Sequence, residues 1–243
     1  MTNLLILTRA RRTDDPYQYL SETIAQIVRE RAPLASFGIV SDGAYSGPRP
    51  DGWKIYEFDR MSPSVPSGPC SLPGNKLPFW HALSVGANLG GDLIFLEDDL
   101  TLSANAIRRM AAFLVPRDLA WVQFFSPHIF TKPDTYPGLW RPPSGSSIFL
   151  QASKFPSWAL PTIVAWQMDP RFARYQASDD ALAFAASILE LNWGAHAPDL
   201  VQHAGEISEA EQTSTLTEFR VSKCWAGQRF DSLSLFTRDD LYR

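Results

Sequence analysis

Two short apolar runs joined by one helix constrain the fold of this chain more than any other feature. The first run, Asn3–Thr8 (NLLILT), is almost continuously apolar, as in a strand that is buried on both faces. Apolar residues then recur at helical spacing between Tyr17 and Val28, and a second run follows at Ala35–Ser41 (ASFGIVS). A strand, a helix and a strand with short links form a right-handed crossover between parallel strands. The sequence therefore predicts an α/β fold with a mostly parallel central sheet flanked by helices.

Later segments continue this alternation of strands and helices. The pattern predicts strands at Trp53–Phe58, Asp92–Leu96, Leu119–Phe125 and Ser146–Gln151, helices at Asn75–Leu89 and Ser178–Leu191, and a further helix capped by Ser103. Ser178 is expected to cap the helix that it begins. The chain has 243 residues, 45% of them hydrophobic and 20% charged, which is ordinary globular composition. We therefore expect a single domain over residues 1–243.

Charge and cysteine content narrow the possible function classes. The formal net charge of −4 disfavours general nucleic-acid binding, because proteins that rely on phosphate contacts are usually basic overall. The two cysteines, Cys70 and Cys224, are too few for a disulfide framework or a four-thiolate zinc site. The N-terminal apolar run fits neither a signal peptide nor a membrane span. We expect a soluble protein of the cytoplasm.

Three consecutive carboxylates give the strongest indication of function. Glu97, Asp98 and Asp99 directly follow the predicted buried strand Asp92–Leu96. Open α/β sheets bind ligands at the carboxyl ends of their strands, and like charges this close favour a divalent cation as counter-charge. Asp99 is the preferred metal ligand and Asp98 the next. An exposed acidic turn that happens to follow a strand is the alternative.

This segment resembles the DxD region of GT-A-fold glycosyltransferases, which use nucleotide-sugar donors. The resemblance covers roughly residues 3–205, with Glu97 as the first acid of the triplet. It implies that Asp99 binds Mn²⁺ or Mg²⁺ on the donor diphosphate, and that Glu97 and Asp98 orient the ribose and the sugar. It also implies a nucleotide-sugar-binding half at about 1–100, an acceptor and catalytic half at about 101–205, and a tail at 206–243.

The resemblance extends to further donor contacts, in the order in which the family has them. The residues that would contact the nucleotide sugar are Thr8, Arg9 and Arg11 after the first strand, Asp42 after the second, and Asn75 and Lys76 at the start of a helix. The arginines could instead bind a polyanionic acceptor. The alternative to any binding role is that they are solvated charges on the surface.

Two later motifs complete the resemblance. Asp179 and Asp180 resemble the acidic position where inverting members keep their general base, with Asp180 as the better match. Asp in the first turn of a helix is also good capping chemistry and needs no catalytic role. His203, which follows the apolar pair Leu200-Val201, resembles the metal-binding histidine of many of these enzymes. A lone histidine is otherwise a hydrogen-bonded structural residue.

The predicted function is metal-dependent transfer of a sugar from a nucleotide sugar, with a UDP-sugar as the expected donor, to an acceptor hydroxyl. The acceptor is either a glycan or a hydroxymethylated pyrimidine in DNA, as in phage enzymes that act in the host cytoplasm. A nucleotidyltransferase is an alternative, although the segment TRARRTDDP lacks the usual glycines after the first strand. The second alternative function is a non-catalytic sugar-binding module, which would bind glycan without metal.

Overall fold

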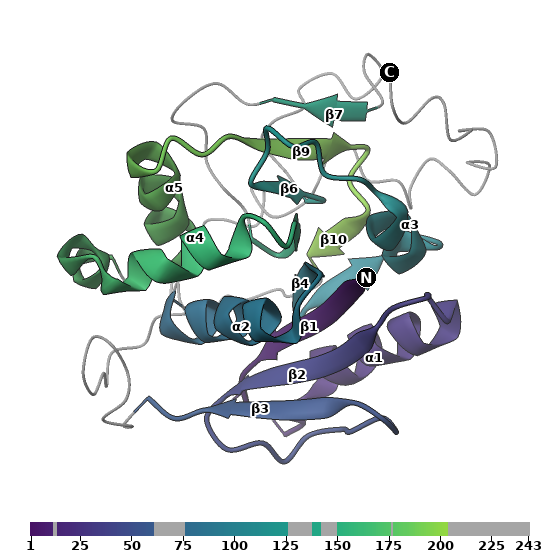
Figure 1. Cartoon of the computed structure of the whole chain (residues 1–243). Helices are drawn as coiled ribbons and strands as arrows, with labels where there is room; N and C mark the ends of the chain where they lie inside the picture. Colours follow the sequence, from purple (N-terminus) through teal and green to yellow (C-terminus); the bar gives the residue numbers. More distant parts are fainter. Residues whose placement is uncertain (12–13, 61–75, 126–137, 142–149, 176, 204–243) are drawn as a thin grey trace, which may run out of the picture.

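An eight-stranded sheet with the strand order β3-β2-β1-β4-β8-β6-β9-β7 forms the centre of the molecule, with helices on both faces (Figure 1). The computed structural model describes residues 1–11, 14–60, 76–125, 138–141, 150–175 and 177–203. The strands of this sheet are β1 (Thr2–Thr8), β2 (Ser36–Asp42), β3 (Lys54–Phe58), β4 (Asp92–Glu97), β6 (Trp121–Gln123), β7 (Gly138–Trp140), β8 (Ala152–Phe155) and β9 (Trp193–Ala197).

The predicted α/β class with a mostly parallel sheet is confirmed. Strands β3, β2, β1 and β4 are parallel neighbours, and β6 and β9 form another parallel pair. Two strands run the other way: β8 is antiparallel to β4 and β6, and β7 is antiparallel to β9. The carboxyl ends of β1, β2, β3 and β4 therefore meet at one edge of the sheet.

Helices cover both faces because the parallel strands are apolar on both sides. The helices are α1 (Gln18–Glu30), α2 (Lys76–Leu89), α3 (Ala106–Ala112), α4 (Leu160–Ala165) and α5 (Ser178–Ile188), with 3₁₀ turns η1 (Trp166–Met168) and η2 (Pro170–Arg174). Leu5 and Leu7 of β1 point into the core beneath α2, α4 and α5. Leu4 and Ile6 point into the core beneath α1 and α3. This alternation follows from the period of two along a strand.

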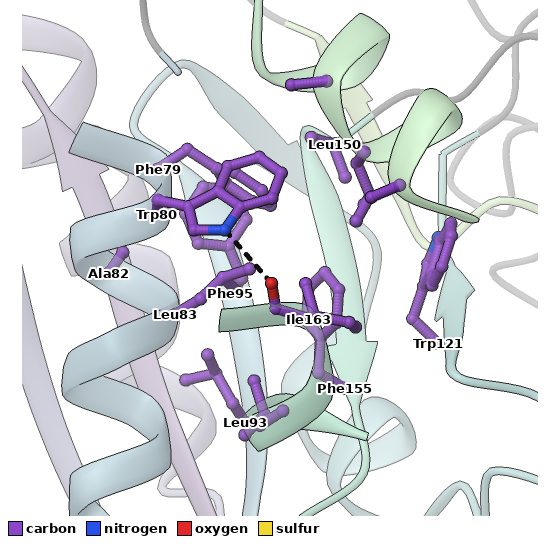
Figure 2. Close-up of a cluster of buried hydrophobic side chains, with 14 of the residues drawn as sticks. Phe79, Trp80, Ala82, Leu83, Leu93, Phe95, Trp121, Leu150, Phe155 and Ile163 are labelled. Carbon is purple, nitrogen blue, oxygen red and sulfur yellow. Dashed lines mark hydrogen bonds between the residues drawn. The ribbon is translucent and has the colours of Figure 1, made fainter. Parts of the chain in front are cut away.

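Aromatic side chains fill the core beneath α2 and α4. Figure 2 shows Phe79 and Trp80 of α2 close to Phe95 and Phe155 of the sheet. Trp80 Nε1 donates a hydrogen bond to the carbonyl oxygen of Ile163 in α4 at 3.2 Å, so the one polar atom of this indole is satisfied inside the core. Among the described residues, no helix is both long and apolar enough to cross a membrane.

Several predicted boundaries need correction. Of the strand expected at Ser146–Gln151, residues 146–149 lie outside the described part, and Leu150 and Gln151 are not in a strand; β8 begins at Ala152. The cap of α5 is Ala177 in an extended conformation, while Ser178 is already helical. The cap of α3 is Asn105, and Ser103 contributes its carbonyl oxygen to the amide of Ala106 at 3.1 Å. Helix α5 ends before Glu190, whose φ of 53° is left-handed.

A second, small sheet lies next to the acidic triplet and was not predicted. It pairs β5 (Leu100–Leu102) with β10 (Val201–His203) in an antiparallel register. In this register His203 is the partner of Leu100, the residue after Asp99. The backbone of a segment about one hundred residues further along the chain is thereby brought to the end of β4. The tail at 206–243 lies outside the described residues.

Candidate functional site

The carboxyl edge of the parallel strands gathers most of the predicted site residues. Thr8, at the end of β1, is in register with Ser41 of β2, and Leu7 is in register with Glu97 of β4. Asp42 at the end of β2 is in register with Phe58 of β3. The residues that follow these strand ends therefore approach one another in space, although they are up to ninety residues apart in the chain.

Asp98 and Asp99, here called the acidic pair, are both buried at this edge, with 7% and 8% of their surfaces exposed. Thr8 Oγ1 donates a hydrogen bond to Asp98 Oδ2 at 2.5 Å. Arg11 Nη2 lies 2.8 Å from Asp98 Oδ1 and 3.1 Å from Asp99 Oδ2, so one guanidinium nitrogen bridges both carboxylates. The acidic pair is thus a buried, hydrogen-bonded cluster rather than the exposed acidic turn of the alternative interpretation.

The backbone at the acidic pair is held by α1. The hydroxyl of Thr23 contacts the carbonyl oxygens of Asp98 at 2.8 Å and Leu100 at 3.0 Å. The side chain of Gln26 accepts the amide of Leu102 at 2.8 Å. These contacts fix the turn that links β4 to β5, because a buried hydroxyl and amide hold a backbone best where water is absent.

Burial and mutual repulsion change the protonation of this cluster. Burial raises the pKa of Asp98, and the negative charge of Asp99 raises it further, while the charge of Arg11 and the hydrogen bond from Thr8 oppose the increase. Burial also disfavours the charged guanidinium of Arg11, but the two carboxylates outweigh this effect and raise its pKa. Arg11 therefore stays positively charged, and the buried carboxylates depend on it for compensation.

The metal ligands of the prediction are only partly described. Asp99 is buried and lies in contact with Arg11. The backbone of His203 pairs with Leu100 in the small sheet, but the His203 side chain falls outside the described part. Within the described residues, no three His, Cys, Asp or Glu side chains gather into a group that could hold a metal ion. The two carboxylates of the acidic pair offer hard oxygen ligands of the kind that Mn²⁺ and Mg²⁺ accept.

A second polar cluster lies at the end of β2. Arg60 binds the Asp42 carboxylate with two hydrogen bonds, from Nε at 2.7 Å and from Nη2 at 2.6 Å. Arg9 is half exposed, and its Nε lies 3.9 Å from Asp42 Oδ2. Asp42, which was expected to contact the nucleotide, therefore has Arg60 as its main partner, and the cluster presents two guanidinium groups at this edge.

Of the two predicted contacts at the start of α2, Asn75 lies outside the described residues. Lys76 is buried, and its Nζ donates a hydrogen bond to the carbonyl oxygen of Phe172 at 2.8 Å. The same Nζ lies 4.2 Å from the centre of the Phe172 ring. These contacts join α2 to η2, the segment that precedes α5.

The acidic residues of α5 occupy its first turn. Asp179 is half-buried, and its Oδ1 accepts the backbone amide of Asp180 at 3.1 Å. Asp180 is exposed. Helix α5 packs against α2, which begins at the carboxyl edge of the sheet (Figure 1). Glu97, the first acid of the triplet, is half-buried, and its amide donates to the carbonyl oxygen of Gln151 at 2.8 Å.

Three residues of the site were not identified from the sequence. Thr23 holds the acidic pair from α1, Tyr19 lies 4.7 Å beneath the Arg11 guanidinium, and Arg60 binds Asp42. For Arg60 the sequence does contain a signal, since it follows β3 as Asp42 follows β2. Thr23 and Tyr19 lie on a helix at ordinary spacing, so nothing local marks them.

Comparison with known proteins gives likeness of fold only. No protein-family model matches the chain, and no curated protein matches it. Among solved structures it is similar to the galactosyltransferase LgtC in complex with donor and acceptor sugar analogs, at 9% identity and a TM-score of 0.47 over 74% of this chain and 69% of that chain. It is similar to the inositol-1-phosphate CTP transferase from T. maritima, at 9% identity and a TM-score of 0.47 over 80% and 84%. It is also similar to a glycosyltransferase involved in the glycosylation of the major capsid of PBCV-1, at 8% identity and a TM-score of 0.47 over 85% and 95%.

Proposed function

We propose that this chain transfers a sugar from a nucleotide-sugar donor to an acceptor hydroxyl. The observation that carries the proposal is the acidic pair, which is buried at the carboxyl edge of the parallel strands and bridged by Arg11. Clustered carboxylates at this edge suit a divalent cation, which in turn would bind a ligand that carries phosphate groups. The residues match the order of the DxD resemblance.

The proposed cation is Mn²⁺ or Mg²⁺, held by Asp99 and His203, with Asp98 as the next carboxylate ligand. When bound, it would neutralise the negative charge that builds on the departing diphosphate. Support comes from the donor set, since Asp99 is buried and the register brings the backbone of His203 next to the following residue.

The remaining acids and bases of the edge would hold the donor, a UDP-sugar. Glu97 and Asp98 would orient the ribose and the sugar, and Arg11 would contact the diphosphate. Further proposed contacts to the nucleotide sugar are Arg9, Asp42 and Asn75. In the described structure the Thr8 hydroxyl donates a hydrogen bond to Asp98, and the Lys76 amine donates one to the carbonyl oxygen of Phe172. Both residues would therefore support the donor site through these partners.

Asp180 is the proposed general base. It would take the proton from the acceptor hydroxyl while that oxygen attacks the anomeric carbon, which makes the reaction inverting. Its exposure is compatible with access by a large acceptor. Asp179, whose side chain caps the amide of Asp180, would position it.

The proposed acceptor is a hydroxyl of a glycan or of a hydroxymethylated pyrimidine in DNA. Salt separates the two, because DNA binding releases counterions and weakens steeply with ionic strength. Binding of a neutral glycan is expected to change little between 50 and 200 mM salt.

Two substitutions test the assigned roles. We expect Asp99→Ala to weaken Mn²⁺-dependent binding of UDP at least about tenfold, because a buried cation ligand is lost. Asp180→Asn is expected to keep UDP binding and to lower kcat by a factor of about 10²–10⁴, because only proton transfer is lost. Calorimetry with UDP and release of UDP from a UDP-sugar measure the two effects.

The matched control is Asp51→Asn, an exposed acid in the turn before β3. It is expected to behave as the wild type in both assays. Normal turnover by Asp180→Asn would show that another group is the base, and unchanged UDP binding by Asp99→Ala would remove the cation from the proposal.

A further inference from the structure

We propose that Arg11 is the resident counter-ion of the acidic pair, and that a divalent cation binds this pair only by displacing its guanidinium. The inference rests on the proposed function, since it concerns how that same site is loaded. It makes Arg11 an internal competitor of the cation.

The guanidinium of Arg11 already occupies the bridging position between the two carboxylates. A single nitrogen, Arg11 Nη2, lies 2.8 Å from Asp98 Oδ1 and 3.1 Å from Asp99 Oδ2. A divalent cation that uses these oxygens would lie at about 2.0–2.6 Å from them. A cation that bridges Asp98 Oδ1 and Asp99 Oδ2 from the side that Arg11 Nη2 now occupies would crowd that nitrogen, and the two positive charges would repel. Binding of one therefore requires departure of the other.

The burial of the acidic pair explains why a counter-ion must be present at all times. Asp98 and Asp99 are 7% and 8% exposed, and they are consecutive in the chain. Two buried carboxylates without compensation are strongly unfavourable, because each loses its hydration and each repels the other. Arg11 supplies the compensation while no metal is bound, and its own side chain is 15% exposed, so it keeps a route toward solvent.

Contacts on both sides of Arg11 keep it in reach of the pair. Its amide donates to the carbonyl oxygen of Pro16 at 3.1 Å, and its guanidinium lies 4.7 Å from the ring centre of Tyr19. Thr8 holds the other oxygen of Asp98 independently of Arg11. Asp98 therefore keeps its orientation after the guanidinium leaves, and the acid site is preformed for the incoming cation.

The test is a calorimetric titration with Mn²⁺ alone, without nucleotide, of the wild type, Arg11→Met, Arg11→Lys and Arg29→Met. Arg29 is an exposed arginine of α1, so Arg29→Met removes the same charge and makes the same substitution away from the site. We expect Arg11→Met to bind Mn²⁺ at least tenfold more tightly than the wild type. Arg11→Lys should lie between them, and Arg29→Met should match the wild type. An affinity of Arg11→Met equal to or below that of the wild type would overturn the inference.

A measurement on the wild type covers the case in which Arg11→Met does not fold. The Nε–Hε NMR signal of Arg11, identified by its absence in Arg11→Lys, is expected to shift when Mg²⁺ saturates the protein. An unchanged signal at saturation contradicts displacement.

The titrations also separate this inference from the proposed function. Equal Mn²⁺ affinities in the wild type and Arg11→Met would refute the competition and leave the cation site standing. Absence of Mn²⁺ binding in both would refute the competition and the cation site together. UDP binding by the wild type tests the transferase proposal in either case.

Discussion

His196 in β9 is a buried imidazole between the rings of Phe113 and Phe124, whose centres both lie 5.5 Å from its own. Its Nδ1 lies 2.8 Å from the carbonyl oxygen of Pro198, so the neutral ring donates its proton there. Burial lowers the pKa of His196 from 6.5 to about 4, and the positive charge of Arg109 adds to this effect. The native state therefore holds this residue neutral at all but acidic pH.

This pKa predicts an acid-dependent loss of stability. Above pH 6.5 the imidazole is neutral in both states, but below it the unfolded chain binds a proton that the native state refuses. The free energy of unfolding should therefore fall as the pH is lowered from 6.5 to about 4, by up to about 3 kcal/mol from this residue. Urea unfolding of the wild type and His196→Asn across this range measures the effect.

His196→Asn is expected to show a clearly smaller pH dependence, whatever its stability at neutral pH. His81→Asn is the control, since burial also lowers the pKa of His81 but this ring is only half-buried. Equal pH dependence in the wild type and His196→Asn would contradict the assignment.

At the residue scale, the sequence predicts which side chains lie at the site better than it predicts which other side chains they contact. Asp98 and Asp99 could be identified because they directly follow a buried strand. The bridge from Arg11 spans 87 and 88 residues and depends on the fold of the loop after β1. Lys76 was expected at the donor, yet its amine finds the carbonyl oxygen of Phe172, 96 residues later. A long side chain at a helix start has many possible partners, and only tertiary structure selects one.

At the scale of elements, the link between α2 and β4 depends on two glycines with different surroundings. Gly90 and Gly91 have φ of 71° and 78°, which other residues adopt at a cost. A Cβ on Gly90 would meet nothing within 4 Å, whereas one on Gly91 would lie 2.4 Å from the carbonyl oxygen of Met1. That oxygen cannot move freely, because it accepts the amide of Asp92 at 2.9 Å.

We therefore expect Gly90→Ala to lower the free energy of unfolding by about 1 kcal/mol, the cost of the left-handed backbone alone. Gly91→Ala adds a collision with the backbone and should cost about 3 kcal/mol or more. Denaturant unfolding measures the free energy of unfolding of both variants, provided that the dependence of this free energy on denaturant concentration has the same slope as in the wild type. Similar losses in the two variants would show that the approach to Met1 does not constrain this link.

The elements also show where prediction from the sequence ends. Long apolar runs such as β1 and β2 were found within one or two residues, because buried parallel strands and their helical crossover leave a strong pattern. The three-residue strands β5 and β10 are too short to show a period, and they become visible only through their pairing. The caps of α3 and α5 were misassigned by one or two residues: α3 is capped at Asn105, two residues after Ser103, and α5 at Ala177, one residue before Ser178.

At the scale of the whole molecule, the sheet brings distant segments to one edge and buries them there. The acidic pair, Thr8 and Arg11 come from the ends of two adjacent parallel strands, and β10 joins them through the small sheet. Two cores, one on each face of the sheet, hold these strands in place. The two cores fix where the strands end, and the charge balance among the side chains at that edge is what a bound cation would change.

The measurement that tests this central claim most directly is a thermal-shift panel of nucleoside diphosphates and UDP-sugars, each with and without Mn²⁺. Binding to the native state at about one hundred times Kd stabilises it by roughly 2.7 kcal/mol. For a chain of this length that corresponds to a rise in Tm of about 5–10 °C. We expect such a rise with UDP or a UDP-sugar when Mn²⁺ is present. No rise in Tm with any nucleotide or nucleotide sugar, with or without Mn²⁺, would contradict the account.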